Sequence, residues 1–395
     1  MDCKELTSSS KPGAIIVEGH IQGLSNTRSL GKAGIPVFVL DRTNCVAQHS
    51  KYCNKFFRCP DFLTDEFIFF LIDLAQHENI LGWVLLPSND HAVYNISKSK
   101  DILEQYYKVI TPHIDIIERI YDKARLIHLA HNLKIPVPKT QCFSYVHEPI
   151  SENLRFPVIT KGKNGLSFYK AMRVKALVAK NENELRNQLL KIEKEYNVND
   201  TLTQEIIPSS GTNNTISFTA FCDNGSIKTY WTGEKIREHP SRFGTATFAG
   251  STNVPVCLRQ SEVLLRVLDY TGVCEIEYLH DPQSGEYKLI EINARTWLWV
   301  ELAKACGIDY VKMIYNYVNE IPQDYPVKSK LKAYWINPLT DITYSMMHLL
   351  VGKLNPVSYI KSLLNKTLIN ALFKKTDVKP GFVYLLNIFT FLKNR

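Results

Sequence analysis

Residues 1–112 alternate between short apolar runs and longer amphipathic stretches. Four runs have the length and composition of buried strands: 14–18, 35–41, 83–87 and 108–111. The stretches between them carry apolar residues at helical spacing: 24–32, 66–77 and 89–103. This alternation predicts an α/β class, with an open parallel sheet that has helices on both faces.

From residue 113 the pattern changes to helices mixed with paired strands. Helical spacing occurs at 113–120, 122–133, 181–196, 261–271 and 300–305. Asp122 is a suitable N-cap for the second of these helices. We expect two strands joined by a glycine-containing turn over 156–178, and a hairpin of 275–278 with 288–292 around the turn 281–285.

Residues 326–395 differ from the rest in charge. They contain 11 Lys+Arg and 2 Asp+Glu, a net of +9, whereas the whole chain carries +8, so residues 1–325 sum to about −1. A body without excess positive charge does not favour nucleic-acid binding. Amphipathic helices are expected at 344–354 and 357–375, before an apolar run at 382–392. Such a tail fits either a peripheral contact with an anionic membrane or a partner, or packing on the body with its lysines in water.

The composition is that of a folded soluble protein, with 45% hydrophobic and 22% charged residues. Nine cysteines without a C-x-x-C pair argue against metal fingers, redox pairs and a dense disulfide framework. Residues 1–11 lack the apolar core of a signal peptide, and no run reaches the roughly 18 apolar residues of a membrane-spanning helix. We therefore expect a reduced, cytoplasmic protein, which the tail can bring to the inner face of the membrane.

The turn after the first strand raises the question of a dinucleotide site. Gly19 and Gly23 are spaced G-x-x-x-G and not G-x-G-x-x-G, although Asp41 ends the second strand where a ribose-binding acid would stand. The spacing favours a tight turn in a doubly wound sheet over an NAD site.

The most informative polar residues lie on the hairpin that ends near residue 293. Side chains alternate faces along a strand, so Glu291 and Asn293 share one face, and Arg295 joins them if the strand extends that far. Glu277 on the partner strand can face them. Two carboxylates, an amide oxygen and a guanidinium then converge on one surface, and the oxygen ligands among them suit Mg²⁺ that bridges phosphates. The other interpretation is a ladder of surface charges, but an acid among apolar neighbours needs a partner or a function.

Glu277-Tyr278, followed by Ile290-Glu291-Ile292-Asn293-Ala294-Arg295, resembles the E-F … E-(I/V)-N-P-R signature of ATP-grasp enzymes, with Ala294 in place of proline. The resemblance implies that Glu277, Glu291 and Asn293 hold two Mg²⁺ ions, or Mn²⁺ in their place, against the phosphates of ATP. It also implies that Arg295 stabilises the transferred group.

Two lysines stand where that superfamily has phosphate-binding lysines. Lys123, at a helix start, resembles the first nucleotide lysine. Lys161, which ends Phe156-Pro157-Val158-Ile159-Thr160-Lys161, resembles the strand lysine on the α- and β-phosphates. Residues 162–167 take the place of the glycine-rich flap, with only two glycines.

Residues 202–208 resemble the hinge that pairs with adenine. The resemblance assigns backbone contacts to Gln204 and Ile207 and makes Glu205 the polar side chain beside the nucleotide. Taken alone, Glu205 is a solvated acid at a strand end, and only its place between Lys161 and Glu277 gives it weight.

Residues 234–245 resemble the K-x-R-x-x-P-x-x-x-G segment of ATP-grasp ligases. Lys235 and Arg237 are expected on one strand face, where both point at an anion and assist catalysis.

The resemblance covers residues 14–320 and implies an α+β ATP-grasp fold in four parts. These are a Rossmann-like pre-ATP-grasp domain (1–112), linker helices with a lid subdomain (113–200), a catalytic subdomain (201–325) and a basic helical tail (326–395). The implied activity is that of an ADP-forming carboxylate–amine ligase, similar to D-aspartate ligases, which activates a small carboxylate as an acyl phosphate and joins it to an amine. A homodimer is expected from the same resemblance. Bicarbonate phosphorylation, as in carbamoyl-phosphate synthases, and an ATP-binding regulator without turnover stay open as alternatives.

The acceptor site is the part that the sequence leaves open. Ser88-Asn89-Asp90 lie at the carboxyl edge of the first sheet, where open α/β folds bind ligands, but Ser88 also suits a helix cap. Trp297 and Trp299 suit a wall of the acceptor pocket and the core equally well.

Overall fold

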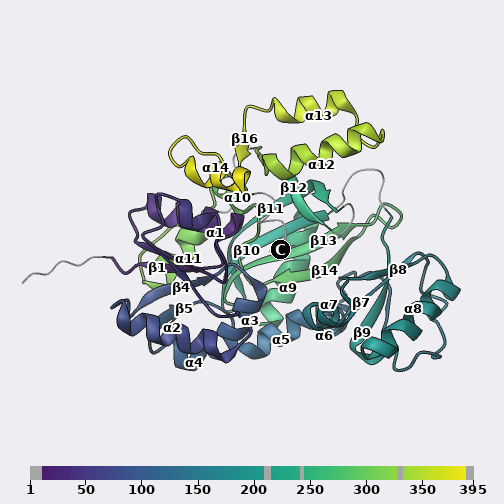
Figure 1. Cartoon of the computed structure of the whole chain (residues 1–395). Coiled ribbons are helices and arrows are strands. Elements are labelled where there is room, and N and C mark those ends of the chain that lie inside the picture. The colour runs from purple at the N-terminus through teal and green to yellow at the C-terminus, as the bar shows by residue number, and fades with distance from the viewer. Residues whose placement is uncertain (1–10, 209–214, 241–243, 327–331, 388–395) are drawn as a thin grey trace, which may run out of the picture. The chain divides into compact units, whose positions relative to one another are not determined.

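The computed structural model describes residues 11–208, 215–240, 244–326 and 332–387 (Figure 1). The chain divides into two compact units. The first unit comprises residues 1–113 and 294–395, and the second comprises residues 114–293. Residues 294–325, which the sequence analysis placed in the catalytic subdomain, therefore belong to the first unit, where their helices contact α1. The other boundaries of the four-part division stay predictions.

The first unit is built on a parallel sheet in the order β3-β2-β1-β4-β5, which confirms the expected parallel sheet. Its strands are β1 (Ala14–Val17), β2 (Val37–Asp41), β3 (Lys55–Arg58), β4 (Trp83–Pro87) and β5 (Tyr107–Val109). The edge strand β3 was not predicted, because its Lys-Phe-Phe-Arg sequence is short and half polar.

Helical elements connect these strands: α1 (Ile21–Lys32), the 3-10 helix η1 (Ala47–His49), α2 (Asp65–His77), α3 (Asp90–Lys98) and α4 (Lys100–Leu103). Ile15 and Val17 lie in the core beneath α2, whereas Ile16 lies next to α1. A Cβ on Gly23 would stand 2.1 Å from the carbonyl oxygen of Glu18. Only glycine therefore lets α1 pack this closely against the turn after β1.

Asp41 holds the turn after β1. Its carboxylate accepts hydrogen bonds from the backbone N–H of Gly19 at 2.9 Å and of Thr43 at 3.2 Å. A carboxylate committed to the backbone in this way supports the tight turn over a ribose-binding role.

The C-terminal part of the first unit contains α10 (Val300–Ala305), α11 (Tyr310–Val318), β15 (Tyr334–Ile336), α12 (Pro338–Leu350), α13 (Pro356–Leu363), β16 (Leu368–Asn370) and α14 (Lys379–Leu386). The helix expected over 357–375 is wrong beyond Leu363, because residues 368–370 pair in parallel with β15 instead. Of the expected apolar run 382–392, residues 388–392 lie outside the described residues.

A buried ion pair attaches this part to α1. The Arg28 guanidinium binds the Asp377 carboxylate at 2.8 Å, and its other nitrogens donate to the carbonyl oxygens of Ala371, Leu372 and Asp377. Both charged side chains are almost fully buried. The sequence left two interpretations of the tail open, a membrane or partner contact and packing on the body. For residues 371–377 the structure shows packing on the body.

The second unit begins with α5 (Ile114–Tyr121) and α6 (Lys123–Asn132). Asp122 caps α6 as predicted, since its carboxylate accepts from the N–H groups of Ala124 and Arg125. A four-stranded antiparallel sheet follows in the order β6-β9-β7-β8. The strands of this sheet are β6 (Thr140–Gln141), β7 (Val158–Gly162), β8 (Leu177–Ala179) and β9 (Thr201–Glu205). The helices between them are α7 (Gly165–Met172), α8 (Glu182–Glu195) and the 3-10 helix η2 (Val198–Asp200).

The glycine-containing turn expected between the two strands of 156–178 is wrong. Helix α7 fills that position, and its Phe168 is fully buried in the core of this sheet. The segment compared with a glycine-rich flap, residues 162–167, thus includes the start of a packed helix, because a buried aromatic side chain holds it down.

The larger sheet of the second unit runs in the order β14-β13-β10-β11-β12, with antiparallel neighbours. Its strands are β10 (Thr215–Asp223), β11 (Ser226–His239), β12 (Thr245–Thr252), β13 (Gly272–His280) and β14 (Tyr287–Asn293). Helix α9 (Pro255–Val267) lies between β12 and β13 in the chain. The expected hairpin is confirmed as β13–β14.

Candidate active site

Two glutamates face each other on β13 and β14. Glu277 is the direct partner of Glu291 in the antiparallel register, and Glu275 is the partner of Asn293. Residues two apart on a strand share a face, so all four side chains lie on one surface of the sheet. Like charges directly opposite each other destabilise a sheet. This surface therefore calls for a cation.

Glu275 is the member that the sequence analysis missed. Its carboxylate is 3% exposed and accepts hydrogen bonds from Ser217 Oγ at 2.8 Å and Asn293 Nδ2 at 3.2 Å. The sequence already indicated Glu275 as a candidate, because it precedes Glu277 by two residues on the same strand and so shares its face. Its hydrogen bond orients the Asn293 amide.

Lys235 supplies a cation in this structure. Its Nζ lies 2.8 Å from Glu277 Oε1 and 3.0 Å from Oε2. Burial by itself would lower the pKa of Lys235, but the attraction of Glu277 and Glu275 outweighs it, and the pKa is raised. An ammonium group thus sits where the carboxylates require positive charge.

We expected Lys235 and Arg237 on one strand face because side chains alternate along a regular strand. Strand β11 is irregular at this point. The register of β11 with β12 shifts on both sides of Arg237, which marks a β-bulge. The Arg237 guanidinium lies over the Phe248 ring, 4.0 Å from its centroid. Lys235 reaches Glu277 instead, so the two cations are held by different partners.

Lys161 lies close to two charged residues of the candidate site. Burial lowers its pKa to about 8, repulsion from Lys123 adds to this, and attraction by Glu291 opposes it. The Lys161 ammonium donates to Gln204 Oε1 at 3.0 Å. The structure therefore brings both predicted nucleotide lysines and one predicted metal ligand into electrostatic contact.

The predicted hinge residues Glu205 and Ile207 are both buried, and Glu205 is held by ion pairs. Glu205 is 8% exposed, and its Oε1 accepts from Lys288 Nζ at 3.0 Å and from the Lys139 N–H at 2.9 Å. Lys288 also binds Asp281 at 2.8 Å, so Glu205 is part of a buried ion-pair network. Ile207 is buried. This network gives Glu205 a structural role that the sequence did not indicate.

The strand alternation that places Glu291 and Asn293 on one face ends before Arg295. Strand β14 ends at Asn293, and Arg295 belongs to the first unit. There its Nε and Nη2 donate to the Asp90 carboxylate at 2.8 and 2.7 Å. The condition on which Arg295 would join that face, a strand long enough to include it, is therefore not met.

A polar cluster surrounds this pair at the carboxyl edge of the parallel sheet. Glu18 follows β1 at a φ of 71° and accepts from Gln22 Nε2 at 3.1 Å and Asn89 Nδ2 at 3.0 Å. Burial and then repulsion by Asp41 raise its pKa to about 7. A non-glycine residue at positive φ carries backbone strain, which is common at functional sites. Sequence reasoning missed Glu18, although it is an acid that directly follows a fully apolar strand.

The structure shows which residue caps α3 and how deeply the two tryptophans are buried. Asn89, not Ser88, caps α3, and the buried Ser88 hydroxyl accepts from Asn26. Trp297 and Trp299 are each 1% exposed, so they belong to the core of the first unit.

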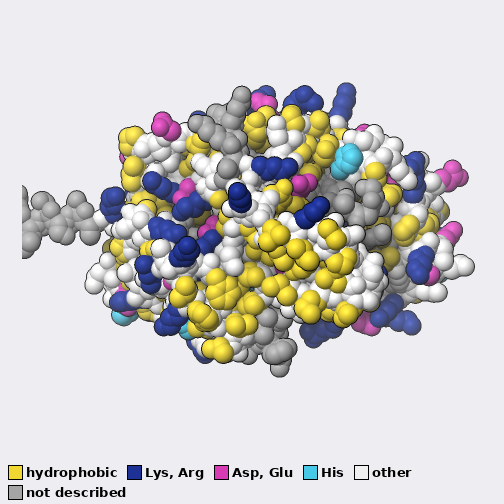
Figure 2. All heavy atoms as spheres, turned by 90° about the horizontal axis from the view of Figure 1, so that it is seen from above, with side chains coloured by type: hydrophobic (Ala, Val, Ile, Leu, Met, Phe, Trp, Pro, Cys, Tyr) yellow, Lys and Arg dark blue, Asp and Glu magenta, His cyan; other side chains and the backbone are white. Residues whose placement is uncertain are grey.

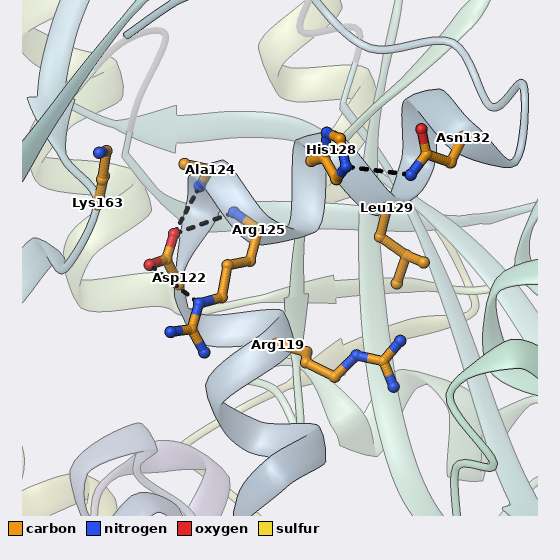
Figure 3. A pocket seen from close by; sticks show the side chains of 8 residues that line it. All are labelled: Arg119, Asp122, Ala124, Arg125, His128, Leu129, Asn132 and Lys163. Atoms are coloured by element: carbon orange, nitrogen blue, oxygen red, sulfur yellow. Dashed lines mark hydrogen bonds and ion pairs between the residues drawn. The ribbon is translucent and has the colours of Figure 1, made fainter. Parts of the chain in front are cut away.

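An open groove of about 570 Å³ lies along α5 and α6 (Figure 3). Among its lining residues are Arg119, Arg125, His128 and Lys163. Figure 3 shows that the two guanidinium groups point in different directions. Neither Lys123 nor Lys161 lines this groove. We therefore place the candidate site on the carboxylate face of β13 and β14.

The described residues contain no group of three or more His, Cys, Asp or Glu side chains arranged to hold a metal ion. Two carboxylates and an amide still fit Mg²⁺, because this ion commonly uses one or two carboxylates together with phosphate oxygens and water. The opposed Glu277 and Glu291, of which Glu277 pairs here with the Lys235 ammonium group, meet that description.

Comparison with known proteins agrees with the geometry. The family described as "Carbamoyl-phosphate synthase L chain, ATP binding domain" matches residues 122–319. A D-aspartate ligase of Enterococcus faecium is 24% identical over 226 residues, which are 54% of this chain and 53% of that protein. The arginine-specific large chain of the Bacillus subtilis carbamoyl phosphate synthase is 27% identical over 256 residues, 61% of this chain and 23% of that protein. The chain thus spans about half or less of these two relatives.

A crystal structure of an L-amino acid ligase from Bacillus licheniformis has the same fold, with a TM-score of 0.62 at 12% identity over 82% of this chain and 80% of that one. The family match extends over 198 residues (122–319) of the 395 in the chain. The chain therefore belongs to the family of carbamoyl-phosphate synthase L chain ATP-binding domains, within the ATP-grasp superfamily.

Proposed function

We propose that the protein is an ATP- and Mg²⁺-dependent ligase, which activates a carboxylate as an acyl phosphate and joins it to an amine. The observation that carries the proposal is the register pair Glu277–Glu291, with Asn293 on the same face and Lys161 nearby. Opposed acids beside two lysines suit a polyphosphate that arrives together with a divalent cation.

Each residue of this surface has a task in the proposal. Glu277, Glu291 and Asn293 would hold two magnesium ions, which Mn²⁺ would be able to replace. Lys161 and Lys123 neutralise phosphate oxygens, and phosphoryl transfer depends mainly on such neutralisation and on positioning. Bound ATP with magnesium supplies the transferable phosphoryl group.

The basic and hinge residues complete the proposal. Lys235, which pairs with Glu277 in this structure, would face the substrate anion once Glu277 held a metal ion, and Arg237 would orient that anion. Backbone groups of Gln204 and Ile207 contact adenine, with Glu205 fixing the hinge through Lys288. Arg295, held by Asp90, acts on the transferred group.

The substrates are proposed by class only. D-aspartate ligase and L-amino acid ligase among the similar proteins support an amino-acid or peptide-like carboxylate and amine. A cytoplasmic location and a homodimer belong to the same proposal.

Bicarbonate phosphorylation is the second candidate activity, and the similarity to a carbamoyl phosphate synthase supports it. An ATP-binding regulator without turnover is the third candidate. Retention of Glu277, Glu291 and Asn293 on one face argues against the regulator.

The test is phosphate release from ATP and Mg²⁺ across a panel of amino acids, dicarboxylates and bicarbonate, with hydroxylamine present to trap acyl phosphates. Glu291→Gln is compared with Glu286→Gln, which changes an exposed acid on the same hairpin. We expect hydroxamate from one carboxylate with the wild type and Glu286→Gln, and none with Glu291→Gln. ATP binding without turnover on any compound would favour the regulator, and absence of ATP binding would contradict the proposal.

A further inference from the structure

Three helices near the C-terminus leave an apolar stripe exposed. On α12 and just after it, Met346, Met347, Leu350 and Val351 are between 56% and 86% exposed. Two further stripes lie on α13 and α14: Val357, Ile360 and the adjoining Leu364, and Phe382, Leu385 and Leu386. Of the 23 large hydrophobic residues that are exposed in the described part of the chain, twelve lie between Ile342 and Leu386. Such a concentration marks an interaction surface.

Figure 2 shows the face that carries these helices, with hydrophobic side chains gathered next to lysine and arginine side chains. All three helices lie in the first unit. We call the apolar residues above, with the lysines around them, the C-terminal face.

The exposed charge of this face is entirely positive within residues 332–387. Its two acids, Asp341 and Asp377, are 0% and 4% exposed. The exposed ionisable side chains are lysines: Lys332, Lys353, Lys361, Lys366, Lys375 and Lys379. The occupant of the face must therefore offer negative charge next to apolar material.

The kind of cation points to lipid and not to protein. Residues 326–395 contain ten lysines and one arginine, Arg395. Protein interfaces are enriched in arginine and aromatic residues and depleted in lysine. Lysine is a compact point charge on a flexible stem, which suits mobile anionic headgroups while the stem covers apolar surface.

A second copy of this chain is a poorer occupant. In a symmetric dimer the same patch meets itself, so the lysines would face lysines.

We propose that the C-terminal face binds peripherally to an anionic lipid bilayer. The apolar stripes of α12, α13 and α14 enter the headgroup region, and the lysines contact lipid phosphates. None of the helices in the described part of the chain has the length and apolar character of a membrane span. The proposal concerns location and is independent of the reaction at β13 and β14.

The test is flotation of the full chain with vesicles of phosphatidylcholine alone and of phosphatidylcholine with phosphatidylglycerol. We expect binding only to the anionic vesicles, and release at high salt. Leu350→Asp/Leu364→Asp should abolish flotation, and Lys353→Gln/Lys361→Gln should lower the partition coefficient about fivefold for each lysine removed.

Two control variants carry the same substitutions elsewhere. Leu81→Asp changes a leucine that is 62% exposed in a loop of the same unit, and Lys170→Gln changes an exposed lysine of the second unit. Both should float as the wild type does. Thermal unfolding of every variant shows that a loss of flotation is not a loss of fold.

Failure of the wild type to float with anionic vesicles would overturn the proposal, as would equal flotation of Leu350→Asp/Leu364→Asp. A concentration-dependent dimer that this double variant disrupts, without lipid binding, would assign the face to a second copy. If the protein were retained on immobilised polyglutamate but did not float with vesicles, the C-terminal face would be assigned to binding an acidic polypeptide.

Discussion

The Arg295 guanidinium binds both oxygens of the Asp90 carboxylate, at 2.8 and 2.7 Å. This pair joins the segment after β14, two residues beyond Asn293 in the chain, to the start of α3 at the carboxyl edge of the parallel sheet. The side chain of Arg295 is 16% exposed and that of Asp90 is 38% exposed. The orientation of Arg295 thus depends on a residue some 200 positions earlier in the sequence.

Arg295→Lys keeps the charge but loses the two-pronged geometry. We expect Arg295→Lys and Asp90→Asn each to lower the free energy of unfolding by about 1 kcal/mol, a modest value because Asp90 is partly exposed. The double variant should lose less than the sum of the two. Urea unfolding of all four proteins measures the coupling, and strict additivity would show that the two side chains do not stabilise each other.

The Lys235–Glu277 pair predicts a specific response to magnesium. In Lys235→Ala, the buried Glu275 and the opposed Glu277 and Glu291 lose their cation, so their mutual repulsion should lower the melting temperature. Mg²⁺ alone should then raise the melting temperature more in Lys235→Ala than in the wild type, because binding to the folded state stabilises it.

Lys374→Ala is the matched control for that experiment, because Lys374 also makes an ion pair, with Glu301 at 2.9 Å, but in the first unit. Its melting temperature should respond to Mg²⁺ as the wild type does. An equal magnesium response in Lys235→Ala and Lys374→Ala would count against a metal site on β13 and β14.

Lys161 predicts proton uptake on nucleotide binding. Its pKa of about 8 in the free protein lies below the usual value of 10.5, so above pH 8 the folded state holds it largely neutral. An ATP phosphate beside it favours the ammonium form. ATP binding at about pH 9 should therefore take up a proton, which calorimetry in buffers of different ionisation enthalpy measures.

Lys161→Met should abolish that proton uptake, whereas Lys170→Met, at an exposed lysine of α7, should retain it. The same pKa shift affects stability. Between pH 8 and 10.5 the unfolded chain binds more protons at Lys161 than the folded one, so this residue makes stability rise with pH there. A wild type without proton uptake would place the phosphates away from Lys161.

The raised pKa of Glu18 predicts that its contribution to folding stability changes with pH in the opposite direction to that of Lys161. Its pKa is raised from 4.5 to about 7, first by burial and then by Asp41. Between these two pH values the folded state binds more protons than the unfolded chain, so stability falls as pH rises, by about 3 kcal/mol in total.

Glu18→Gln removes this titration. The stability of Glu18→Gln relative to the wild type should therefore increase between about pH 4.5 and pH 7, even if the lost hydrogen-bond acceptor costs stability at every pH. Denaturation at several pH values measures the difference. A constant difference across that range would mean that Glu18 titrates normally.

The sequence by itself determined the elements whose pattern is local. The runs at 14–18 and 83–87 predicted strands of the parallel sheet, because a strand buried on both faces must be almost entirely apolar. Asp122 fixed the start of α6, because a cap depends on residues within one turn. The alternation of Glu291 and Asn293, with Glu277 opposite, also followed from the sequence, because a hairpin pairs residues close in the chain.

Only the tertiary structure decided where long-range partners lie. Arg295 turned to Asp90 because β14 ends at Asn293, and Lys235 reached Glu277 across the intervening strand β10. Glu205 acquired Lys288 as a partner from 83 positions away. Such contacts depend on how strands and helices pack, and periodicity along the chain carries no record of which distant charge a side chain will meet.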